Sequence, residues 1–528
     1  MSMPLSKVLE GVEVLDEEGR ACAWRPAPGA DPMIEALAYD SREVRPGCLF
    51  FALSGLHVDG TSFVPQALAA GARAVLFSKD AALSSDSGSA AFVRVADPRL
   101  AMSPAAANFY GHPSRDMAVV GVTGTEGKST TVYLIYQLLR LAGLGAGFFS
   151  TVMSDTGKGE APNPEHQTTP EATAVQRMLA SMRDSGLGFA VVESSSHGLS
   201  ARLNRLGDVA FDVGVMMNVT REHLEFHGTW ERYRDDKANL FRAIGRAGAK
   251  VLGGRDVPRF GVVNADDASA EYFRTATNFP VRSFSSSGSA EADLVASEVL
   301  VDPRGESFAI QEGKARHRAR IELPGAFNVG NALAALLAVS GLTGKSVGEL
   351  VTLLPHLKPV RGRMTAIDRG QGFEVIVDYA HTPSSFLTVF PPLRQRIKGR
   401  MICVFGSAGE RDTEKRPRQG RIAADWFDVV ILADEDPRGE EPMTLLEEIA
   451  AGCPELVRGE RLFLIPDRKE AIRKAFSLAL PGDLVALLGK GHENSIIYSE
   501  GPIPYDELGA AEEALAELGY VGSAAELR

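Results

Sequence analysis

Short, continuous apolar runs recur along the chain and alternate with segments of helical periodicity. Apolar runs of this kind between helices are typical of parallel strands buried on both faces of a sheet. We therefore predict an α/β fold built on parallel sheets. The predicted strands are 48–53, 74–77, 117–122, 189–192, 211–217, 374–377, 401–405, 429–433 and 484–488.

Chain length and turn signals divide this pattern into three predicted domains. A chain of 528 residues exceeds what one hydrophobic core usually fills. The sequence Gly-His-Pro-Ser at 111–114 predicts a linker. We predict an N-terminal α/β domain at 1–112, a central P-loop-type parallel-sheet domain at 113–360 and a Rossmann-like α/β domain at 361–528. Within the central domain, the polar stretch 283–291 is predicted to be a surface loop.

The apolar run 117–122 leads into a glycine-rich loop that ends in Lys128 and Ser129. Such a loop points backbone N–H groups at a phosphate, at the positive end of the following helix. Lys128 would reach the terminal phosphates, and the Ser129 hydroxyl would face Mg²⁺. Five residues, not four, separate Gly121 from Gly127, which departs from the general motif. The alternative, a glycine-rich turn before a helix, gives no reason for Lys-Ser at the helix start.

Polar clusters follow the predicted strands at the edge where ligands bind in open parallel sheets. Glu193 is a candidate Mg²⁺ ligand, because Mg²⁺ prefers carboxylate oxygen and water. A helix cap or a surface acid is the alternative for Glu193. The four-residue spacing of His223 and His227 could suggest a zinc pair, but no third ligand is evident nearby. The clusters are 193–197, 218–223, 378–383, 406–412, 434–438 and 489–493.

Composition and charge narrow the class of protein. A hydrophobic fraction of 45% with 23% charged residues is ordinary for a globular protein, and the net charge of −12 argues against nucleic acid as the main partner. Cys22, Cys48, Cys403 and Cys453 are isolated, which favours a reducing compartment over disulfides or a zinc site. No apolar run reaches transmembrane length and no signal segment is evident. We expect a cytoplasmic protein without a membrane partner.

The loop 121–130 resembles the nucleotide loop of the Mur ligases, in which the extra residue between the glycines is normal. Further motifs of that family follow in its order. The stretch from 40 to 60 resembles the N-terminal uridine-nucleotide domain of the MurE branch, and 436–438 and 489–493 resemble the C-terminal signatures of that branch. The ordered motifs are 193–199, 218–228, 327–332, 362–364 and 378–383. The resemblance covers nearly the whole chain and implies UDP-MurNAc-binding, ATP-binding and amino-acid-binding roles for the three predicted domains, in that order.

The resemblance implies an ATP-dependent ligase of peptidoglycan precursor synthesis, and hence of cell-wall biogenesis, cell shape and division. In this family the D-glutamyl carboxylate of UDP-MurNAc-L-Ala-D-Glu attacks the γ-phosphate of ATP. An amine then captures the acyl phosphate, which gives an amide, ADP and phosphate. Bringing two anions together requires neutralisation, which Lys128 and two Mg²⁺ would provide. The resemblance assigns the metals to Ser129, Glu193 and His223.

Lys237 matches the lysine that the family carbamylates to N6-carboxylysine. Addition of CO₂ turns a cation into a carboxylate-like metal ligand, which explains a lysine in a metal site. From the residues alone, Lys237 would be a solvated helix lysine. The implied catalytic residues are Lys128, Glu193, His223 and Lys237.

The resemblance also implies the binding residues. For ATP these are Gly124, Thr125, Gly127, Lys128, Ser129, Thr130, Asn328, Asn331, Arg363 and Asp378. For the UDP-MurNAc substrate they are Ser41, Gln167, Thr168, Thr169, Ser195 and Arg202. Gln167 replaces the usual asparagine, and Arg205 is the alternative to Arg202. For the amino acid they are Arg411, Asp436, Arg438, Gly489 and Glu493.

The identity of the amino acid is open between lysine, ornithine and meso-diaminopimelate. Family members that use diaminopimelate typically carry Asp-Asn-Pro-Arg, whereas 435–438 reads Glu-Asp-Pro-Arg. The added anion at Asp436 favours an incoming ammonium group over a second carboxylate. That reading favours lysine or ornithine, whereas Arg438 favours diaminopimelate.

Two other functions compete with this interpretation. A folylpolyglutamate-synthetase-like ligase would share the ATP machinery, but the motif at 40–42 and the Asp-Pro-Arg at 436–438 argue against it. A P-loop nucleotide-binding protein without catalysis would not need Glu193, His223 and Lys237 together. The resemblance further implies a monomer.

Overall fold

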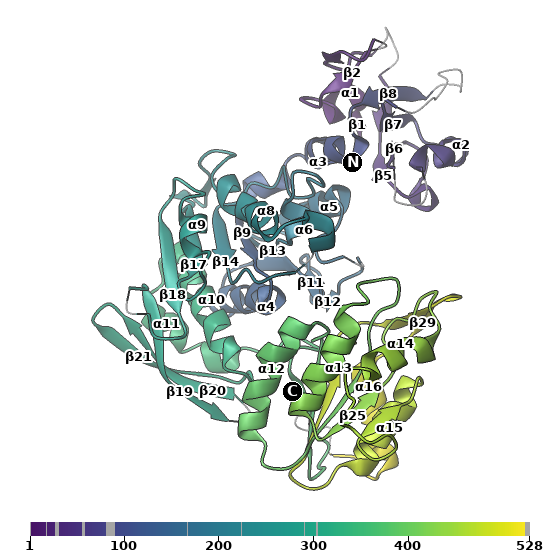
Figure 1. Ribbon diagram of the computed structural model, residues 1–528. Helices are drawn as coiled ribbons and strands as arrows, with labels where there is room; N and C mark the ends of the chain where they lie inside the picture. Colours follow the sequence, from purple (N-terminus) through teal and green to yellow (C-terminus); the bar gives the residue numbers. More distant parts are fainter. Residues whose placement is uncertain are drawn as a thin grey trace. The chain divides into compact units, whose positions relative to one another are not determined.

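Figure 1 presents the computed structural model of the protein, which describes residues 2–16, 18–26, 31–54, 59–80, 90–165, 167–222, 224–289, 291–302 and 305–522. Contacts between Cα atoms group the chain into two compact units. The first unit comprises 1–295 and 333–350, and the second comprises 296–332 and 351–528. The three-domain division made from the sequence stays a prediction.

The N-terminal part of the first unit folds around a small parallel sheet. Its elements are β1 (Met3–Pro4), α1 (Leu5–Val8), β2 (Val14–Leu15), β3 (Ala21–Cys22), β4 (Met33–Ile34), β5 (Ala36–Ala38), β6 (Cys48–Ala52), α2 (Val64–Ala69), β7 (Ala74–Ser78), β8 (Ala91–Val95) and α3 (Pro98–Phe109). The sheet order is β5-β6-β7-β8, with all neighbours parallel. Every residue of β6 is buried, which explains its continuous apolar run.

The rest of the first unit is built on a larger, mostly parallel sheet. Its elements are β9 (Ala118–Thr123), α4 (Lys128–Leu141), β10 (Ala146–Phe149), β11 (Met153–Asp155), β12 (Ala161–Pro162), α5 (Ala172–Asp184), β13 (Phe189–Glu193), α6 (Ser196–Leu199), β14 (Val213–Met216), α7 (Leu224–His227), α8 (Trp230–Ala243), β15 (Val251–Leu252), β16 (Arg255–Asp256), β17 (Phe260–Asn264), α9 (Ala270–Arg274) and β18 (Val281–Ser285). Strand order runs β12-β11-β10-β13-β9-β14-β17-β18. The register pairs Glu193 with Val122 and Met216 with Thr123, so the three central strands end at the same edge.

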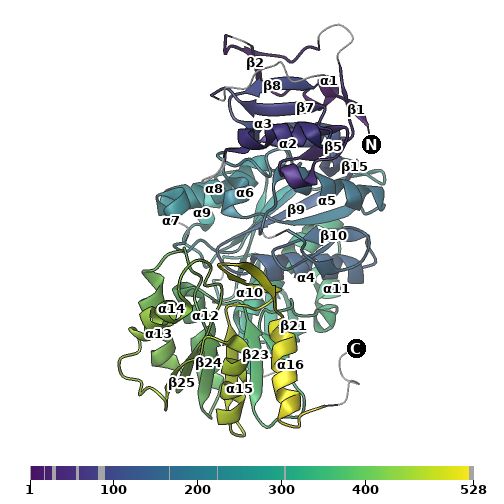
Figure 2. The same ribbon diagram turned by 90° about the vertical axis from the view of Figure 1, so that its right-hand side faces the viewer.

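Helices cover both faces of this sheet. Figure 2 shows α5, α6 and α8 on one side of β9, and α4 on the other. Residues of α5 and α8 share one apolar core with Met117 and Val119 of the sheet. Gly121 of β9 leaves room for α8, because a Cβ there would lie 2.4 Å from Cδ1 of Leu240.

The prediction that 283–291 forms a surface loop is partly wrong. Ser283 and Ser285 belong to β18 and are buried. Their polar groups are satisfied by two acids: the Ser283 N–H and hydroxyl donate to Asp293, and the Ser285 hydroxyl donates to Asp266. Buried serine is tolerated in a strand when it is hydrogen-bonded, so its polarity alone did not mark a loop.

Several elements connect or form the second unit. They are β19 (Leu294–Asp302), which begins in the first unit, β20 (Gly305–Glu312), β21 (Ala315–Ile321), α10 (Phe327–Thr343) and α11 (Val347–Val351), which straddle the division, β22 (Thr365–Ile367), β23 (Glu374–Asp378), α12 (Pro383–Arg396), β24 (Met401–Phe405), α13 (Lys415–Trp426), β25 (Val429–Leu432), α14 (Pro442–Ala450), β26 (Leu462–Leu464), α15 (Arg468–Leu478), β27 (Leu484–Leu488), β28 (Ser495–Tyr498), β29 (Gly501–Pro504) and α16 (Glu507–Glu517). The main sheet of this unit has the order β22-β23-β27-β24-β25-β26, with β22 antiparallel and the others parallel.

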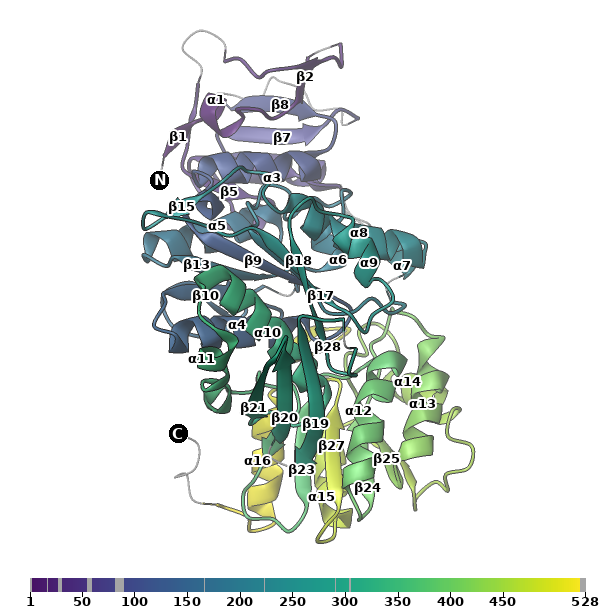
Figure 3. The same ribbon diagram turned by 90° about the vertical axis from the view of Figure 1, so that its left-hand side faces the viewer.

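Alternate residues of these strands serve two separate cores. Met401, Cys403 and Phe405 of β24 pack with α12, α13 and α14, while Ile402 and Val404 pack with α15 and α16. Figure 3 shows the two helix groups on opposite faces of the sheet. The predicted α/β fold with parallel sheets is confirmed. In the part of the chain that the structure describes, no helix has the length and apolarity to cross a membrane.

A buried ion pair lies beneath β9 in the first unit. Lys250 Nζ donates to Asp212 Oδ2 at 2.6 Å and to the carbonyl oxygens of Met117 and Ala210. Both side chains are at most 5% exposed, and burial raises the pKa of Asp212 and lowers the pKa of Lys250. The lysine therefore satisfies several polar groups that have no access to water.

Replacing Lys250 by methionine should destabilise the first unit by about 3–5 kcal/mol, because it leaves the Asp212 carboxylate buried and unpaired. Urea unfolding measures the change. The matched control is Lys7→Met, since Lys7 forms an exposed ion pair with Glu10 and should cost about 1 kcal/mol at most. Equal losses in the two variants would contradict this account of the pair.

Candidate active site

The glycine-rich loop between β9 and α4 is held by its own backbone and by one asparagine. Gly127 has φ of 81°, a conformation that favours glycine, and it precedes the first residue of α4. Asn218, just after β14, accepts the N–H groups of Thr125 at 3.1 Å and Glu126 at 2.8 Å. Lys128 folds back so that Nζ donates to the Thr125 carbonyl at 2.8 Å. The loop is thus ordered by contacts within the protein.

Ser129 and Glu193, expected to share a metal, lie in hydrogen-bond contact. The Ser129 hydroxyl donates to Glu193 Oε2 at 2.9 Å. Thr151, in the turn after β10, donates its N–H to Oε2 at 2.8 Å and its hydroxyl to Oε1 at 3.0 Å. Thr130 follows on the same turn of α4 and is half-buried. Sequence reasoning missed Thr151, because no local pattern marks it.

The pair of Ser129 and Glu193 fits Mg²⁺ by the chemistry of its donors. Mg²⁺ in nucleotide sites is bound through one or two protein oxygens, water and substrate phosphates. Among the described residues, no group of three or more His, Cys, Asp or Glu side chains is arranged to hold a metal ion without such help.

Lys237 projects from α8 and is buried, unlike the solvated lysine that the residue pattern alone suggests. It is 1% exposed, and Nζ donates to the Gly124 carbonyl at 2.6 Å. Burial, and next the positive charge of Lys128, hold the pKa of Lys237 well below its ordinary value. Nζ lies 4.4 Å from the ring centroid of Tyr233, whose hydroxyl is 3.1 Å from Thr125 Oγ1. A lysine in this setting is a nucleophilic amine.

His223 lies outside the described residues. His227, the other member of the spacing considered for zinc, has partners on both ring nitrogens. Nδ1 lies 2.7 Å from Asp236 Oδ2, and Nε2 lies 3.1 Å from the Ser196 hydroxyl. Gly228, with φ of 78°, follows the last residue of α7. His227 therefore joins α6, α7 and α8, a structural role.

The residues expected to bind the UDP-MurNAc substrate have different surroundings. Gln167 is exposed and Thr168 is half-buried. Thr169 is buried, donates to the Glu193 carbonyl at 2.9 Å and accepts the Ser195 N–H at 3.0 Å. The Ser195 hydroxyl accepts the Gly198 N–H at the start of α6. Ser41 donates to Gln66 at 3.1 Å on the surface of the N-terminal part.

The two arginines considered for this substrate differ in their engagement. Arg205 donates to the Thr169 carbonyl at 2.9 Å and to Glu171 at 2.8 Å, and Glu171 also pairs with Arg99. Arg202 is exposed, with its guanidinium 5.0 Å from the ring centroid of Phe226. Arg205 thus stabilises the fold through these contacts, and the choice between the two arginines for the substrate stays a prediction.

In the second unit, the expected ATP residue Asp378 lies at the end of β23. Its carboxylate accepts the N–H groups of Met364 and Ala380, each at 2.7 Å, while burial raises the pKa of Asp378. Arg363 lies with its guanidinium 4.7 Å from the Tyr379 ring centroid. Asn328 and Asn331, at the start of α10, are bonded to each other at 2.9 Å.

A buried lysine links two of the residues expected to bind the amino acid. Lys490 Nζ donates to Asp436 Oδ1 at 2.9 Å and to Glu493 Oε2 at 2.6 Å. Asp436 Oδ1 also accepts the Ile497 N–H of β28 at 3.0 Å. Asp436 thus compensates Lys490 and anchors the hairpin β28–β29. Its expected role toward an incoming ammonium group stays a prediction.

Two of the expected positions in the neighbouring loops have a positive φ. Arg438 has φ of 57°, and its N–H donates to the Ile497 carbonyl at 2.8 Å. Gly489 has φ of 96°, and a Cβ there would lie 2.8 Å from Glu435 Oε2. That oxygen is buried and has no hydrogen-bond partner, and burial raises the pKa of Glu435. Arg411 is exposed. Non-glycine residues with a positive φ, such as Arg438, occur often at functional sites.

Arg468, at the start of α15, holds the strand ends of this unit together. It donates to the carbonyl oxygens of Asp434 and Leu488 and pairs through two bonds with Glu507, and both side chains are fully buried. The polar segments after β25 and β27 therefore leave the sheet from a fixed point. Sequence reasoning missed this arginine because it lies far from the motifs.

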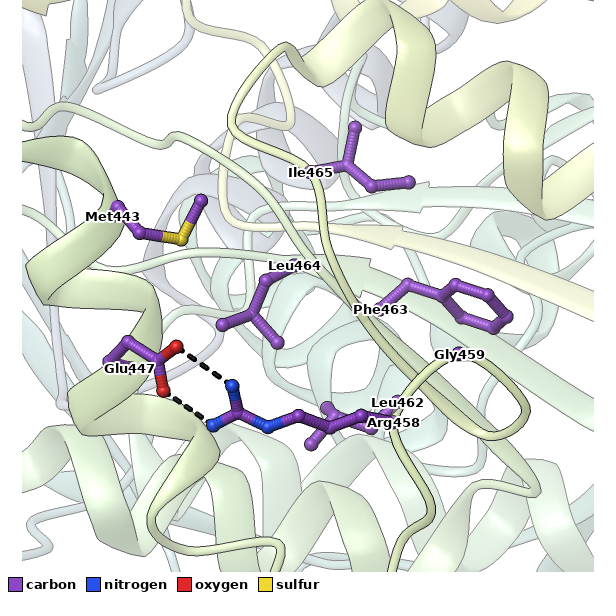
Figure 4. A pocket seen from close by; sticks show the side chains of 8 residues that line it. All are labelled: Met443, Glu447, Arg458, Gly459, Leu462, Phe463, Leu464 and Ile465. Atoms are coloured by element: carbon purple, nitrogen blue, oxygen red, sulfur yellow. Dashed lines mark hydrogen bonds and ion pairs between the residues drawn. The ribbon is translucent and has the colours of Figure 1, made fainter.

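A separate cavity of about 370 Å³ lies beside β26 in the second unit (Figure 4). In it, Arg458 pairs with Glu447 on α14, while Phe463, Leu464 and Ile465 come from β26 and the following residue. None of the residues expected to bind ATP or the amino acid lines it.

Comparisons with known proteins match this fold and these motifs. Family models match 122–339, described as Mur ligase middle domain, 362–491, described as Mur ligase, glutamate ligase domain, and 33–110, described as Mur ligase family, catalytic domain. Together they span most of the chain. The protein belongs to the Mur ligase family, so the family resemblance is confirmed.

Individual relatives agree with that membership. A UDP-N-acetylmuramyl-tripeptide synthetase of Treponema denticola is 51% identical over 506 residues, covering 92% of this chain and 94% of that protein. A UDP-N-acetylmuramoyl-L-alanyl-D-glutamate–2,6-diaminopimelate ligase of Syntrophomonas wolfei is 37% identical, covering 92% and 95%. A solved structure of a ligase of the latter name is 27% identical with a TM-score of 0.62, covering 98% of this chain and all of that one. The MurF ligase of Thermotoga maritima in complex with ADP, at 21% identity and a TM-score of 0.62, shares the fold.

Asn218 offers a test of how the loop is ordered. Replacing it by alanine removes the acceptor of two loop N–H groups and should weaken binding of ADP by about tenfold, equivalent to about 1.4 kcal/mol. Asn218→Asp keeps the acceptor but adds a negative charge near the phosphates, and should weaken binding further. Titration with a fluorescent ADP analogue measures both. Unchanged affinity in the alanine variant would show that the loop orders itself without Asn218.

Proposed function

We propose that this protein is a cytoplasmic, ATP-dependent and ADP-forming ligase that adds a diamino acid to UDP-MurNAc-L-Ala-D-Glu. The reaction would pass through an acyl phosphate and add the third residue of the peptidoglycan stem peptide. The observation that carries the proposal is the grouping of Lys128, Ser129, Glu193 and Lys237 around one phosphate loop. Membership of the Mur ligase family supports it, and the names of the relatives agree with it.

The residues of the first unit divide this chemistry between them. The Lys128 ammonium would neutralise charge on the transferred phosphoryl group while the two anionic reactants approach. Ser129 and Glu193 would hold Mg²⁺, which neutralises phosphate oxygens. The remaining backbone N–H groups of the loop, which Asn218 helps to order, would donate to the phosphates. Ser41, Gln167, Thr168, Thr169, Ser195 and Arg202 would hold the uridine-linked substrate.

The burial of Lys237 supports its conversion to N6-carboxylysine. Only a neutral amine adds to CO₂: the nitrogen lone pair forms the C–N bond, one N–H proton leaves to water, and a carbamate anion remains. Because its pKa is held well below the ordinary value, Lys237 carries a larger fraction of that neutral amine than an exposed lysine does. The product carries a negative charge beside Lys128, whose repulsion of the lysine ammonium is then replaced by attraction.

Lys237 should therefore carry a carbamate when CO₂ is present. ¹³C NMR of protein equilibrated with ¹³C-bicarbonate should give a carbamate resonance that Lys237→Arg abolishes, and ligation should fall by at least about tenfold in CO₂-free buffer. The matched control is Lys250→Arg, since Lys250 is also buried but already pairs with Asp212. A resonance that survives in Lys237→Arg would contradict the assignment.

For the amino acid, we favour lysine or ornithine. Around the expected pocket, Asp436 and Glu493 pair with Lys490, and Glu435 provides a third carboxyl group near the same lysine. An ammonium group of the substrate would join this cluster of acids. A second carboxylate, as in diaminopimelate, would meet these acids.

A product-mass assay tests the function and the amino acid together. ATP, Mg²⁺ and UDP-MurNAc-L-Ala-D-Glu are supplied with lysine, ornithine or meso-diaminopimelate separately, and we expect a tripeptide mass with lysine or ornithine. Asp436→Asn should reduce the preference for that amino acid over diaminopimelate by about tenfold, or about 1.4 kcal/mol. Reaction with diaminopimelate alone would assign the pocket to Arg438.

The same assay separates the competing functions. If no tripeptide forms and the protein instead adds glutamate to a folate, a folylpolyglutamate-synthetase-like ligase is favoured. The chain shares the fold of a folylpolyglutamate synthase at 15% identity and a TM-score of 0.59. Binding of ATP without any ligation would favour a nucleotide-binding protein. We further propose a monomer, which sedimentation of the free protein tests.

A further inference from the structure

The carboxylate of Glu193 is fixed from two sides. Its main chain is anchored at the end of β13, where the Glu193 carbonyl accepts the Thr169 hydroxyl. Its side chain is 1% exposed, so bulk water cannot satisfy it. A buried carboxylate without donors is costly. The donors that satisfy Glu193 therefore determine where its oxygens lie.

Thr151 supplies most of these donors. Its N–H and hydroxyl bind different oxygens of Glu193, at 2.8 and 3.0 Å, which fixes both the position and the rotation of the carboxylate. The third donor, the Ser129 hydroxyl, is one that a bound metal would engage. Thr151 is then the partner that remains for Glu193 when nucleotide is bound.

The turn that carries Thr151 is itself rigid. It follows β10, which pairs with β13 in a register that places Phe149 beside Val192. The Ser150 hydroxyl accepts the N–H groups of Val152 and Met153, and the Ser150 N–H donates to the Met153 carbonyl. Asn163 donates to the Ser150 carbonyl at 2.8 Å and so closes the turn from outside.

We propose that Thr151 is a positioning residue that sets metal affinity by fixing the Glu193 carboxylate. This inference rests on the proposed function, in which Ser129 and Glu193 hold the metal of the nucleotide. Partners of metal ligands typically change metal affinity by about 10–100-fold when they are removed. Thr151 acts through Glu193 and needs no contact with nucleotide or metal.

The experiment measures metal binding without turnover. Mn²⁺ replaces Mg²⁺ as a paramagnetic probe, and electron paramagnetic resonance titrates it into the protein saturated with a non-hydrolysable ATP analogue. Thr151→Val keeps the N–H donor but loses the hydroxyl, and should weaken Mn²⁺ binding about tenfold. Thr151→Ser restores the hydroxyl and should restore the wild-type affinity. Thermal melting without ligand checks each fold, and Thr151→Ala replaces the valine variant if that variant does not fold.

Controls separate this role from others. The matched control is Thr156→Val, because Thr156 is a half-buried threonine of the same segment that is not among the donors to Glu193 described above. This variant should leave the Mn²⁺ affinity unchanged. Equal Mn²⁺ affinity in wild type and Thr151→Val overturns the inference, as does equal weakening in the serine and valine variants. A raised KM for UDP-MurNAc-dipeptide with unchanged Mn²⁺ affinity overturns it in favour of direct substrate contact. Failure of the wild type to form tripeptide, by contrast, refutes the proposed function itself.

Discussion

Charged side chains buried at the carboxyl ends of parallel strands impose the constraint on which the rest of the structure depends. A buried charge without partners costs several kcal/mol, so each must be met by hydrogen bonds from nearby elements. In the first unit, Glu193 collects donors from β10 and α4. In the second, Lys490 collects acceptors from the ends of β25 and β27. The order of the strands therefore determines which donors and acceptors can reach each buried charge.

The charged side chains that gather at the two sites differ in sign. The first unit places the Lys128 ammonium and the Lys237 amine close to carbonyl oxygens of the loop. The second unit places acids around one cation and closes them with a hairpin and with Arg468. A region rich in positive charge suits phosphates, and a region rich in acids suits an amine. This difference in charge agrees with the proposed binding of phosphates in the first unit and of an amine in the second.

Much of the fold could be predicted because the strands are buried on both faces. The segments 48–52 and 484–488 are apolar at every position, and the structure has strands there. Position in the sequence also located the polar clusters at strand ends. What could not be predicted depends on which strands are neighbours: Thr151 and Glu193 are 42 residues apart and meet only because β10 lies beside β13. The burial of Lys237 likewise requires α8 to pack over the loop, and helical periodicity alone leaves that lysine on a solvated face.

The hairpin β28–β29 contacts the Glu-Asp-Pro-Arg segment through its backbone. The Ile497 N–H binds Asp436, and the Ile497 carbonyl binds the Arg438 N–H. Backbone contacts do not depend on side-chain identity, so natural selection can alter the residues of the hairpin freely while its length and pairing stay fixed. Among descendants of a common ancestor, we expect the hairpin to diverge in sequence but rarely to gain or lose residues. An alignment would then show a gap-free but variable segment at the hairpin.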